Sequence, residues 1–461
     1  MPKAATTLEE AYQTLSPEPL MTEEDLAAFY SPQLNEVRGG DRVERLSLRL
    51  RQASGSFCKV FLMGHSGVGK STELSRLVRR VSDRYSVIRF SLTSQLDPIS
   101  FKPFDVLLFM MAEVVERTAK PIKEGGAGCQ LSESRLKELL DWFAIETSTV
   151  TRERQAVVGA EGGAGLEGRS LWASILGLFA NVKGEIRYAA DRKTELVEYR
   201  FNRLSTLIEL ANRLLDDCNL LLREATGREW LFVGEDFDKP GVSPARVEEL
   251  FLTYGNVIRD LRAHLIFTIP IALGYSQQGS RLPVPNSVTP ILDTPVYDPQ
   301  HAKHRVGVVA LRSLLTARVD AGLFTAGVVD RLAVASGGNL RDLLFLAREA
   351  VEEAILAGAQ KVGKPHADTV VNRLRLEYTR RLGESPFDKE VIPYEQKAAR
   401  LVKVYENVPD AKIPDPVLYS LFHCRAVQEF NGEGWLGVHP LVVDILKTQG
   451  RLPNDAPGGT G

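Results

Sequence analysis

One short stretch, rich in glycine, constrains the fold of this chain more than any other feature. Residues 64–71 read Gly-His-Ser-Gly-Val-Gly-Lys-Ser and match the pattern G-x-x-x-x-G-K-[ST]. An apolar run at 59–63 precedes them, and residues 72–81 follow with helical periodicity. Glycines permit the positive φ angles of such a turn, and the N–H groups at a helix start attract an anion. The stretch therefore predicts a phosphate-binding loop between a strand and a helix of an α/β fold.

The side chains of this loop supply the groups that a nucleoside triphosphate and its metal require. We expect the Lys70 ammonium to reach the β and γ phosphates and the Ser71 hydroxyl to coordinate Mg²⁺. The predicted cofactors are therefore ATP and Mg²⁺. The residues predicted to bind them are Gly64, His65, Ser66, Gly67, Val68, Gly69, Lys70, Ser71 and Thr72.

Three carboxylates, Glu235, Asp236 and Asp238, follow another apolar run at 230–234. We expect Glu235 to act on Mg²⁺ through water and Asp236 to polarise the attacking water, although the two roles could be exchanged. An acidic cluster after a strand is often only a solvated turn. Its functional interpretation therefore depends on the loop at 64–71.

Further apolar runs at 86–92, 264–269 and 288–292 alternate with helical segments such as 103–118. Apolar strands separated by helices indicate a parallel sheet that is covered on both faces. After the last run, helices predominate, and a hairpin around residues 431–434 suggests a winged-helix module.

A long segment between the second and third apolar runs predicts a helical insert at about 120–225. It contains a glycine run at 159–168, interpreted as a loop, and a helical pattern at 191–224. The predicted divisions are a lead-in at 1–35, a core at 36–300 with this insert, a helical lid at 301–385, a winged-helix-like domain at 386–453 and a disordered tail at 454–461.

The chain resembles a bacterial P-loop ATPase of the AAA+ superfamily, near the origin-initiator clade and the STAND signalling ATPases. The resemblance spans about residues 37–350 and, less closely, the C-terminal end. The motifs that carry it are GHSGVGKSTEL, GEDFDKP, HLIFTIP, SGGNLRDLL and Val37-Arg38-Gly39-Gly40-Asp41. It implies an AAA+-like P-loop NTPase with a parallel sheet core, a helical insert, a helical lid and a C-terminal winged helix.

The resemblance also implies roles for three further residues. Arg38 would belong to the box that cups adenine, Thr268 would occupy the sensor-1 position, and Arg341 would reach the γ-phosphate from the lid as sensor 2. The residues then expected to act in catalysis are Glu235, Asp236, Lys70, Thr268 and Arg341.

Several positions depart from the family pattern. Glu235 replaces an aspartate that is more usual at the metal, and Thr268 replaces the commoner asparagine. The candidates for an arginine finger are Arg259, Arg262 and Arg281, and none is unambiguous. We therefore expect hydrolysis to be slow or to depend on assembly.

Composition weighs against partners with a strong negative charge. The chain carries 57 basic and 59 acidic residues, a formal charge of −2. Residues 391–450 contain six basic and seven acidic residues, so few phosphate contacts are available there. The apolar stretch 171–182 is shorter than the roughly 20 residues of a membrane span. We expect a cytoplasmic protein with no membrane partner, reduced cysteines and a protein partner more readily than DNA.

The leading functional hypothesis is an ATP-driven switch whose lid, insert and winged helix signal to a protein partner or drive self-assembly. An initiator-like DNA-binding ATPase is one alternative. A nucleotide-binding scaffold with little turnover is the other.

Overall fold

The computed structural model describes residues 4–53, 55–148, 175, 177, 178, 180, 183, 184, 204–275, 282–284, 286–385, 388, 390–430 and 435–453. Four features named above lie wholly outside these residues: the glycine run at 159–168, the turn at 431–434, the tail at 454–461 and Arg281. Most of the apolar stretch 171–182 and residues 191–203 of the predicted helical pattern also lie outside them.

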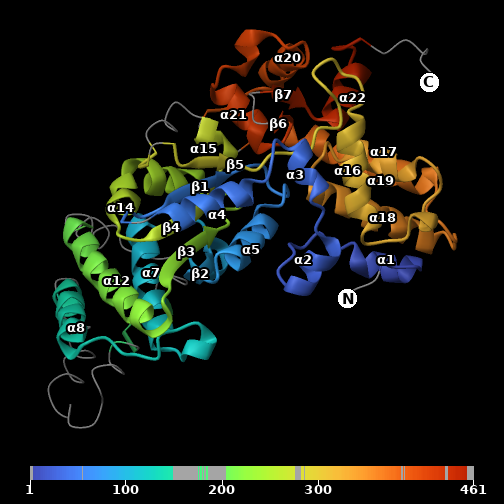
Figure 1. The fold of residues 1–461 in the computed structure, drawn as a ribbon. Coiled ribbons are helices and arrows are strands. Elements are labelled where there is room, and N and C mark those ends of the chain that lie inside the picture. The colour runs from blue at the N-terminus through green and yellow to red at the C-terminus, as the bar shows by residue number, and fades with distance from the viewer. Residues whose placement is uncertain are drawn as a thin grey trace.

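A parallel sheet of five strands forms the centre of the molecule (Figure 1). The strand order is β2-β3-β4-β1-β5, and every neighbouring pair is parallel. Strand β4 therefore separates β1, which leads into the glycine loop, from β3, which leads into the acidic cluster. Parallel strands end at one edge of a sheet, so the loop and the carboxylates meet there. The strand bounds are Lys59–Met63 (β1), Tyr85–Ser91 (β2), Glu229–Glu235 (β3), His264–Ile269 (β4) and Val288–Pro290 (β5).

Alternate strand residues bury themselves on opposite faces of this sheet. Val60 and Leu62 pack with helices α4 (Arg42–Gln52) and α5 (Lys70–Arg80). Phe61 and its counterparts in the other strands belong to a separate cluster, with helices α7 (Pro103–Ala119) and α12 (Leu204–Thr226). Burial on both faces explains why the strands read as continuous apolar runs. With the loop between β1 and α5, this is an AAA+-like P-loop NTPase fold, as predicted.

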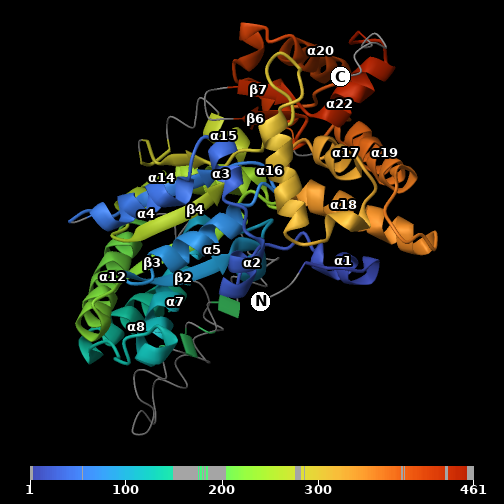
Figure 2. The same ribbon diagram turned by 45° about the vertical axis from the view of Figure 1, so that its right-hand side comes forward.

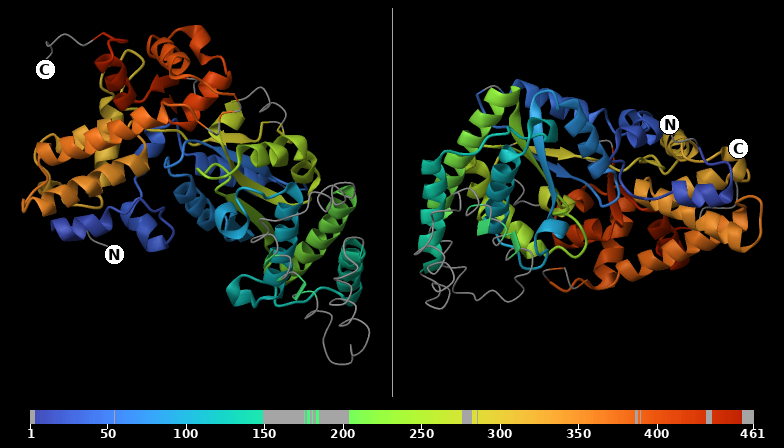
Figure 3. Two further views of the ribbon diagram at one scale, coloured as in Figure 1. Left: turned by 180° about the vertical axis from the view of Figure 1, so that it is seen from behind. Right: turned by 90° about the horizontal axis from the view of Figure 1, so that it is seen from below.

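The insert covers part of one sheet face through α12 and continues beyond it. Helices α8 (Glu133–Ser148) and α12 lie side by side and project on the side opposite the C-terminal module (Figures 1 and 3). Of the helical pattern predicted at 191–224, the described part is α12. The shorter core elements are α6 (Leu92–Gln95), η1 (Ile122–Glu124), α13 (Pro244–Glu248), η2 (Glu249–Thr253), α14 (Gly255–Asp260) and α15 (Ile271–Tyr275).

Helices follow the sheet in the chain, as expected for a lid. The lid helices are α16 (Arg305–Thr316), α17 (Val328–Ala335), α18 (Leu340–Leu356) and α19 (Lys364–Arg381), with a short η4 (Ala321–Leu323) between the first two. We call the described residues from 388 to 453 the C-terminal module. It contains α20 (Tyr394–Tyr405), η5 (Pro409–Lys412), α21 (Pro416–His423), the antiparallel pair β6 (Val427–Phe430) and β7 (Trp435–Val438), and α22 (Pro440–Thr448). This order of helices and hairpin is that of a winged helix.

The lid, the C-terminal module and two of the three N-terminal helices, the first and the third, share one apolar core. The N-terminal helices are α1 (Leu8–Thr14), α2 (Glu23–Phe29) and α3 (Gln33–Val37). Helix α1 packs on α18 beneath the lid (Figure 2). The N-terminal segment is thus part of the packing around the lid as well as a lead-in to the sheet. None of the described helices combines the length and apolar character needed to cross a bilayer.

Candidate functional site

The backbone of the glycine loop requires glycine at Gly64 and Gly67. Their φ angles are 152° and 89°. A Cβ atom on Gly64 would lie 2.2 Å from the carbonyl oxygen of Ile291, and one on Gly67 would lie 2.5 Å from Asn339 Oδ1. Helix α5 begins at Lys70, directly after the loop. A glycine turn that runs straight into a helix N-terminus is the arrangement that binds phosphate groups.

The Lys70 ammonium is buried and uses its donors within the protein. Nζ donates to the carbonyl oxygens of Gly64 and His65 at 2.8 and 2.9 Å, and it pairs with Asp238 Oδ2 at 2.7 Å. No role was predicted for Asp238 from the sequence. The signal was present in the acidic cluster itself, where Asp238 is the third carboxylate.

The first two carboxylates of the cluster have different partners. Glu235 forms an ion pair with Arg89, a residue of β2. Asp236 has a φ of 72° and accepts hydrogen bonds from the hydroxyls of Ser91 and Thr93. Positive φ is uncommon outside glycine and marks functional turns in many proteins. The strained turn at Asp236 brings Asp238 back toward the loop.

A cavity of about 180 Å³ opens beside the loop. Lys70, Ser71, Asp236 and Asp238 line one end of it, together with Thr268 from β4. Thr268 is 2% exposed, and its Oγ1 atom has no hydrogen-bond partner among the described residues. A buried hydroxyl without a partner is costly unless a ligand or water completes it. The structure thus brings together most of the residues predicted to act on phosphate.

The apolar end of this cavity comes from residues of two segments, and none of these residues was predicted from the sequence to belong to the site. The N-terminal segment contributes Phe29 and Leu34, and the lid contributes Leu314, Leu344 and Arg318. The sequence signals were the aromatic end of α2 and Leu344, which is the last residue of the SGGNLRDLL motif. This end offers the apolar walls that a nucleobase requires.

The Arg318 guanidinium anchors that apolar end. It lies 5.1 Å from the centre of the Phe29 ring and donates to the Phe29 carbonyl oxygen at 3.2 Å. Burial lowers the pKa of Arg318 to about 10. The side chain therefore remains charged at neutral pH.

Arg38, predicted to cup adenine, supports the loop from another side. Its Nε donates to Thr294 Oγ1 at 2.9 Å and its NH1 to the Val68 carbonyl oxygen at 3.1 Å. Burial lowers its pKa. Arg38 is not among the residues that line the cavity. The structure therefore places its side chain against the loop and Thr294, and its role at adenine stays a prediction.

The lid contacts the loop through Arg341 and Asn339. Arg341 NH1 donates to Ser66 Oγ at 2.7 Å, and its backbone N–H donates to the Gly67 carbonyl oxygen at 3.1 Å. Asn339 Nδ2 donates to the Ser66 carbonyl oxygen and to Asp293 Oδ1, each at 3.1 Å. Arg341 thus lies at the loop, as its predicted role requires.

Behind the loop, His65 is tied to Asp293. The His65 Nδ1 atom lies 2.8 Å from Asp293 Oδ2, and both side chains are buried. Burial acts to raise the pKa of Asp293, but the bonds from His65 and Asn339 and the charge of Arg38 hold it below its ordinary value. Asp293 therefore remains a carboxylate that links the loop to the lid.

The C-terminal module also reaches the loop. Arg425 NH1 pairs with Asp342 Oδ1 of the lid at 3.1 Å and donates to the Ser66 carbonyl oxygen at 3.4 Å. Gln428 donates to the Gly337 carbonyl oxygen at 3.0 Å. The sequence could not reveal these contacts, because Arg425 is 359 positions from Ser66.

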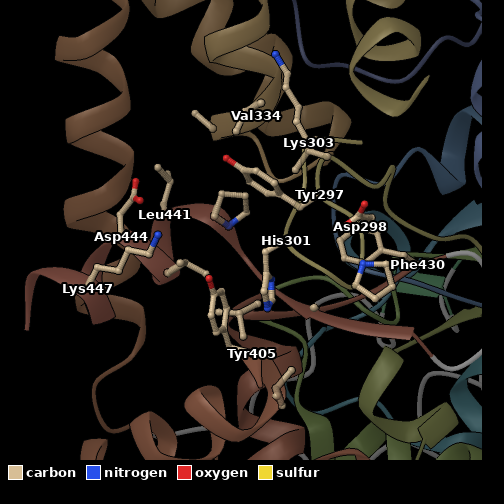
Figure 4. A pocket seen from close by; sticks show the side chains of 18 of the residues that line it. Tyr297, Asp298, His301, Lys303, Val334, Tyr405, Phe430, Leu441, Asp444 and Lys447 are labelled. Atoms are coloured by element: carbon tan, nitrogen blue, oxygen red, sulfur yellow. The ribbon is translucent and has the colours of Figure 1, made fainter. Parts of the chain in front are cut away.

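Two larger cavities lie nearby. One, of about 780 Å³, adjoins the loop and shares Ser66, Asp238 and Arg341 with the first cavity. The other, of about 620 Å³, lies between residues 296–303, the lid helix α17 and the C-terminal module (Figure 4). In its wall the rings of His301 and Tyr405 stack with their centres 3.8 Å apart. The segment between the core and the lid is therefore also bound to the C-terminal module.

No cluster of three or more His, Cys, Asp or Glu side chains that could hold a metal occurs in the described part of the chain. Mg²⁺ ordinarily takes one or two carboxylates together with substrate phosphates and water. The residues around Ser71 fit such a cation only together with a nucleotide.

No protein-family model matches the chain, and no curated protein is similar to it. Among solved structures, the Aeropyrum pernix Orc1 protein in complex with DNA aligns over 95% of this chain and 96% of its own, with 14% identity and a TM-score of 0.36. Drosophila ORC bound to DNA aligns over 96% and 92%, with 12% identity and a TM-score of 0.34. The Walker-type ATPase of Pyrococcus abyssi aligns over 94% and 99%, with 14% identity and a TM-score of 0.35. These values are too low to transfer a function, so the strand order and the loop identify the fold.

Proposed function

We propose that the chain is an ATP- and Mg²⁺-binding molecular switch with ATPase activity, and that its lid and C-terminal module pass the nucleotide state to a protein partner or to further copies of the chain. One observation carries this proposal: Ser66 of the loop is held by Arg341 and Asn339 from the lid and by Arg425 from the C-terminal module. A phosphate bound at this loop would act on both parts at once.

The residues at the cavity fit ATP with Mg²⁺. The glycine loop, the Lys70 ammonium, the Ser71 hydroxyl and the free Thr268 hydroxyl line the end suited to phosphates. ATP supplies the terminal phosphoryl group for transfer to water, and Mg²⁺ supplies positive charge to the phosphates. Lys70 would exchange its protein oxygen partners for phosphate oxygens. Arg341 would neutralise charge from the lid side.

Asp236 and Thr268 would act on the attacking water. The hydroxyls of Ser91 and Thr93 fix one oxygen of the Asp236 carboxylate. A carboxylate held in this way can accept a proton or orient water with its remaining oxygen. Thr268 has an uncommitted hydroxyl at the same end of the cavity and could donate to or accept from that water.

Slow or assembly-dependent hydrolysis is part of this proposal. Two candidate arginine fingers are surface residues with acidic partners: Arg259 pairs with Asp260 at 2.8 Å, and Arg262 pairs with Asp216 at 2.5 Å. A partner or a second copy would have to supply the missing cation. Mass measurement in solution with ADP and with a non-hydrolysable ATP analogue tests this nucleotide-dependent assembly.

Substitution of Lys70 and of Arg425 tests the switch. Lys70→Ala should lose ATP binding in calorimetry. Arg425→Ala should keep binding but lose the nucleotide-dependent change in amide exchange across α20–α22. Arg400→Ala is the matched control, because Arg400 belongs to the same module and pairs with Asp415. Undiminished ATP binding by Lys70→Ala, or equal exchange of the wild-type module in ATP and ADP, would refute the proposal.

Duplex DNA binding is the alternative left open by the sequence. Fewer basic side chains are available for it than the six that residues 391–450 contain. Lys397 is 0% exposed and donates to the Gly383 carbonyl oxygen at 2.6 Å. Arg400 pairs with Asp415 and Arg425 pairs with Asp342. Three of the six basic residues at 391–450 are therefore engaged within the protein, which favours a protein partner over phosphate contacts.

A further inference from the structure

We infer that Asp238, and not Glu235, is the carboxylate that faces the divalent cation, and that Arg89 is a positioning residue that withholds Glu235 from it. This inference rests on the proposed binding of ATP and Mg²⁺. It reassigns the residue that the sequence placed at the metal.

The lining of the cavity beside the loop distinguishes the three carboxylates of the acidic cluster. Asp236 and Asp238 line it together with Ser71, whereas Glu235 is not among its lining residues. Glu235 is also 7% exposed, although it stands at the end of β3. The side chain expected at the metal is thus covered.

Arg89 accounts for this covering. In the parallel register of β2 and β3, Ser91 lies opposite Glu235, so Arg89 stands two residues back and on the same sheet face. Its Nε forms the ion pair with Glu235, its NH1 donates to Ser75 Oγ at 2.8 Å, and its NH2 donates to the Ser71 carbonyl oxygen at 3.0 Å. The guanidinium thereby joins Glu235 to the first turn of α5.

A cation that used Glu235 would have to break this pair. The side chains of Arg89 and Glu235 are 21% and 9% exposed, so the freed guanidinium would remain largely buried without its carboxylate. Removing one partner from a buried ion pair is strongly unfavourable. Glu235 is therefore better explained as the counter-ion that fixes Arg89 and the start of α5.

Asp238 has the opposite character. Its side chain is 8% exposed, faces the cavity and pairs with Lys70 at 2.7 Å. Lys70 also donates to the Gly64 and His65 carbonyl oxygens, so protein oxygens occupy the positions around the ammonium that phosphate oxygens would take. When phosphates take Lys70, the Asp238 carboxylate is released into the cavity that Ser71 also lines. A carboxylate and a serine hydroxyl that line one cavity suit Mg²⁺ or one of its waters.

The experiment separates cation binding from turnover. Calorimetry with a non-hydrolysable ATP analogue, in Mg²⁺ and in EDTA, gives the gain in affinity that the cation confers. Mn²⁺ paramagnetic resonance with the same analogue reports the cation directly. Asp238→Asn should reduce the cation-dependent gain by about 10–100-fold, the range typical for loss of a group that orients a metal ligand. In EDTA it should bind the analogue at least as well as the wild type, because Lys70 is no longer paired.

Glu235→Gln should keep the cation-dependent gain and the Mn²⁺ signal. If this variant does not fold, Arg89→Gln/Glu235→Gln removes both charges of the pair and serves in its place. Loss of the gain in either of these variants, with the gain retained in Asp238→Asn, would overturn the inference and leave the proposed function standing. A wild-type chain that binds the analogue in neither condition would instead refute the proposed function.

Discussion

Gly67→Ala is the substitution that best isolates the contact between the loop and the lid. At Gly67 the φ angle is 89°, and a Cβ atom would lie 2.5 Å from Asn339 Oδ1 and 2.6 Å from Arg341 Cβ. The left-handed conformation alone costs alanine roughly 1–2 kcal/mol. To relieve the clash, α18 must withdraw, which removes the hydrogen bonds from Arg341 N–H to Gly67 and from Asn339 to Ser66. At about 0.5–1.5 kcal/mol each, these losses raise the expected cost to roughly 2–5 kcal/mol.

Gly327→Ala is the matched control. Gly327 has a similar φ of 80°, and an added Cβ atom there meets nothing within 4 Å. It should show the backbone cost alone, so the difference between the two variants should be about 1–3 kcal/mol. Denaturant unfolding measures both stabilities, and amide exchange in α18 locates the loss. Equal destabilisation of the two variants, with α18 protected in both, would show that the lid does not rest on Gly67.

Three further substitutions test other parts of the structure. Burial lowers the pKa of His439 to about 4 from an ordinary 6.5, so only the unfolded chain takes up this proton between these values. The free energy of unfolding should be at its full value above pH 6.5 and should fall by about 3 kcal/mol as the pH is lowered toward 4. In pH-dependent unfolding measurements, His439→Asn should flatten this dependence. Phe29→Ala should weaken ATP binding about tenfold to a hundredfold by calorimetry, and unchanged affinity would remove the N-terminal segment from the site. Lys397→Ala should destabilise the C-terminal module by about 3–5 kcal/mol, whereas Lys403→Ala, at an exposed position, should not. Equal unfolding midpoints for the two variants would contradict the burial of the Lys397 ammonium.

Local patterns in the sequence were sufficient to predict the fold class. The loop, its flanking strand and helix, and the acidic cluster after β3 each lie within a dozen residues, and the chemistry of each follows from spacing alone. Alternating strands and helices then imply the parallel sheet. The strand order was not predicted from these patterns, and it is observed in the pairing of β4 with both β1 and β3.

The partners of the site residues could not be predicted in this way. Arg89 lies 146 positions from Glu235, and nothing near either residue in the sequence indicates that they pair. The apolar end of the cavity joins Phe29 to Arg318, which are 289 positions apart. Burial and ion pairing at such distances are decided by the packing of whole elements. A motif therefore predicts which residue types meet, while the structure decides which carboxylate remains open to a ligand.

The contacts of the loop also indicate where a response to nucleotide would begin. A ligand shifts a conformational equilibrium only through interactions that differ between the two states. Lys70 now holds the His65 carbonyl oxygen, and phosphates would remove that bond. The next carbonyl in the chain, that of Ser66, is the one held by Asn339 and Arg425. The two planar peptide groups are joined at the Cα atom of Ser66, whose φ and ψ set their relative orientation. Release of the first carbonyl therefore changes the orientation of the second. We therefore expect the lid and the C-terminal module to respond through the peptide between His65 and Ser66, whereas the largely buried strands of the sheet stay in place.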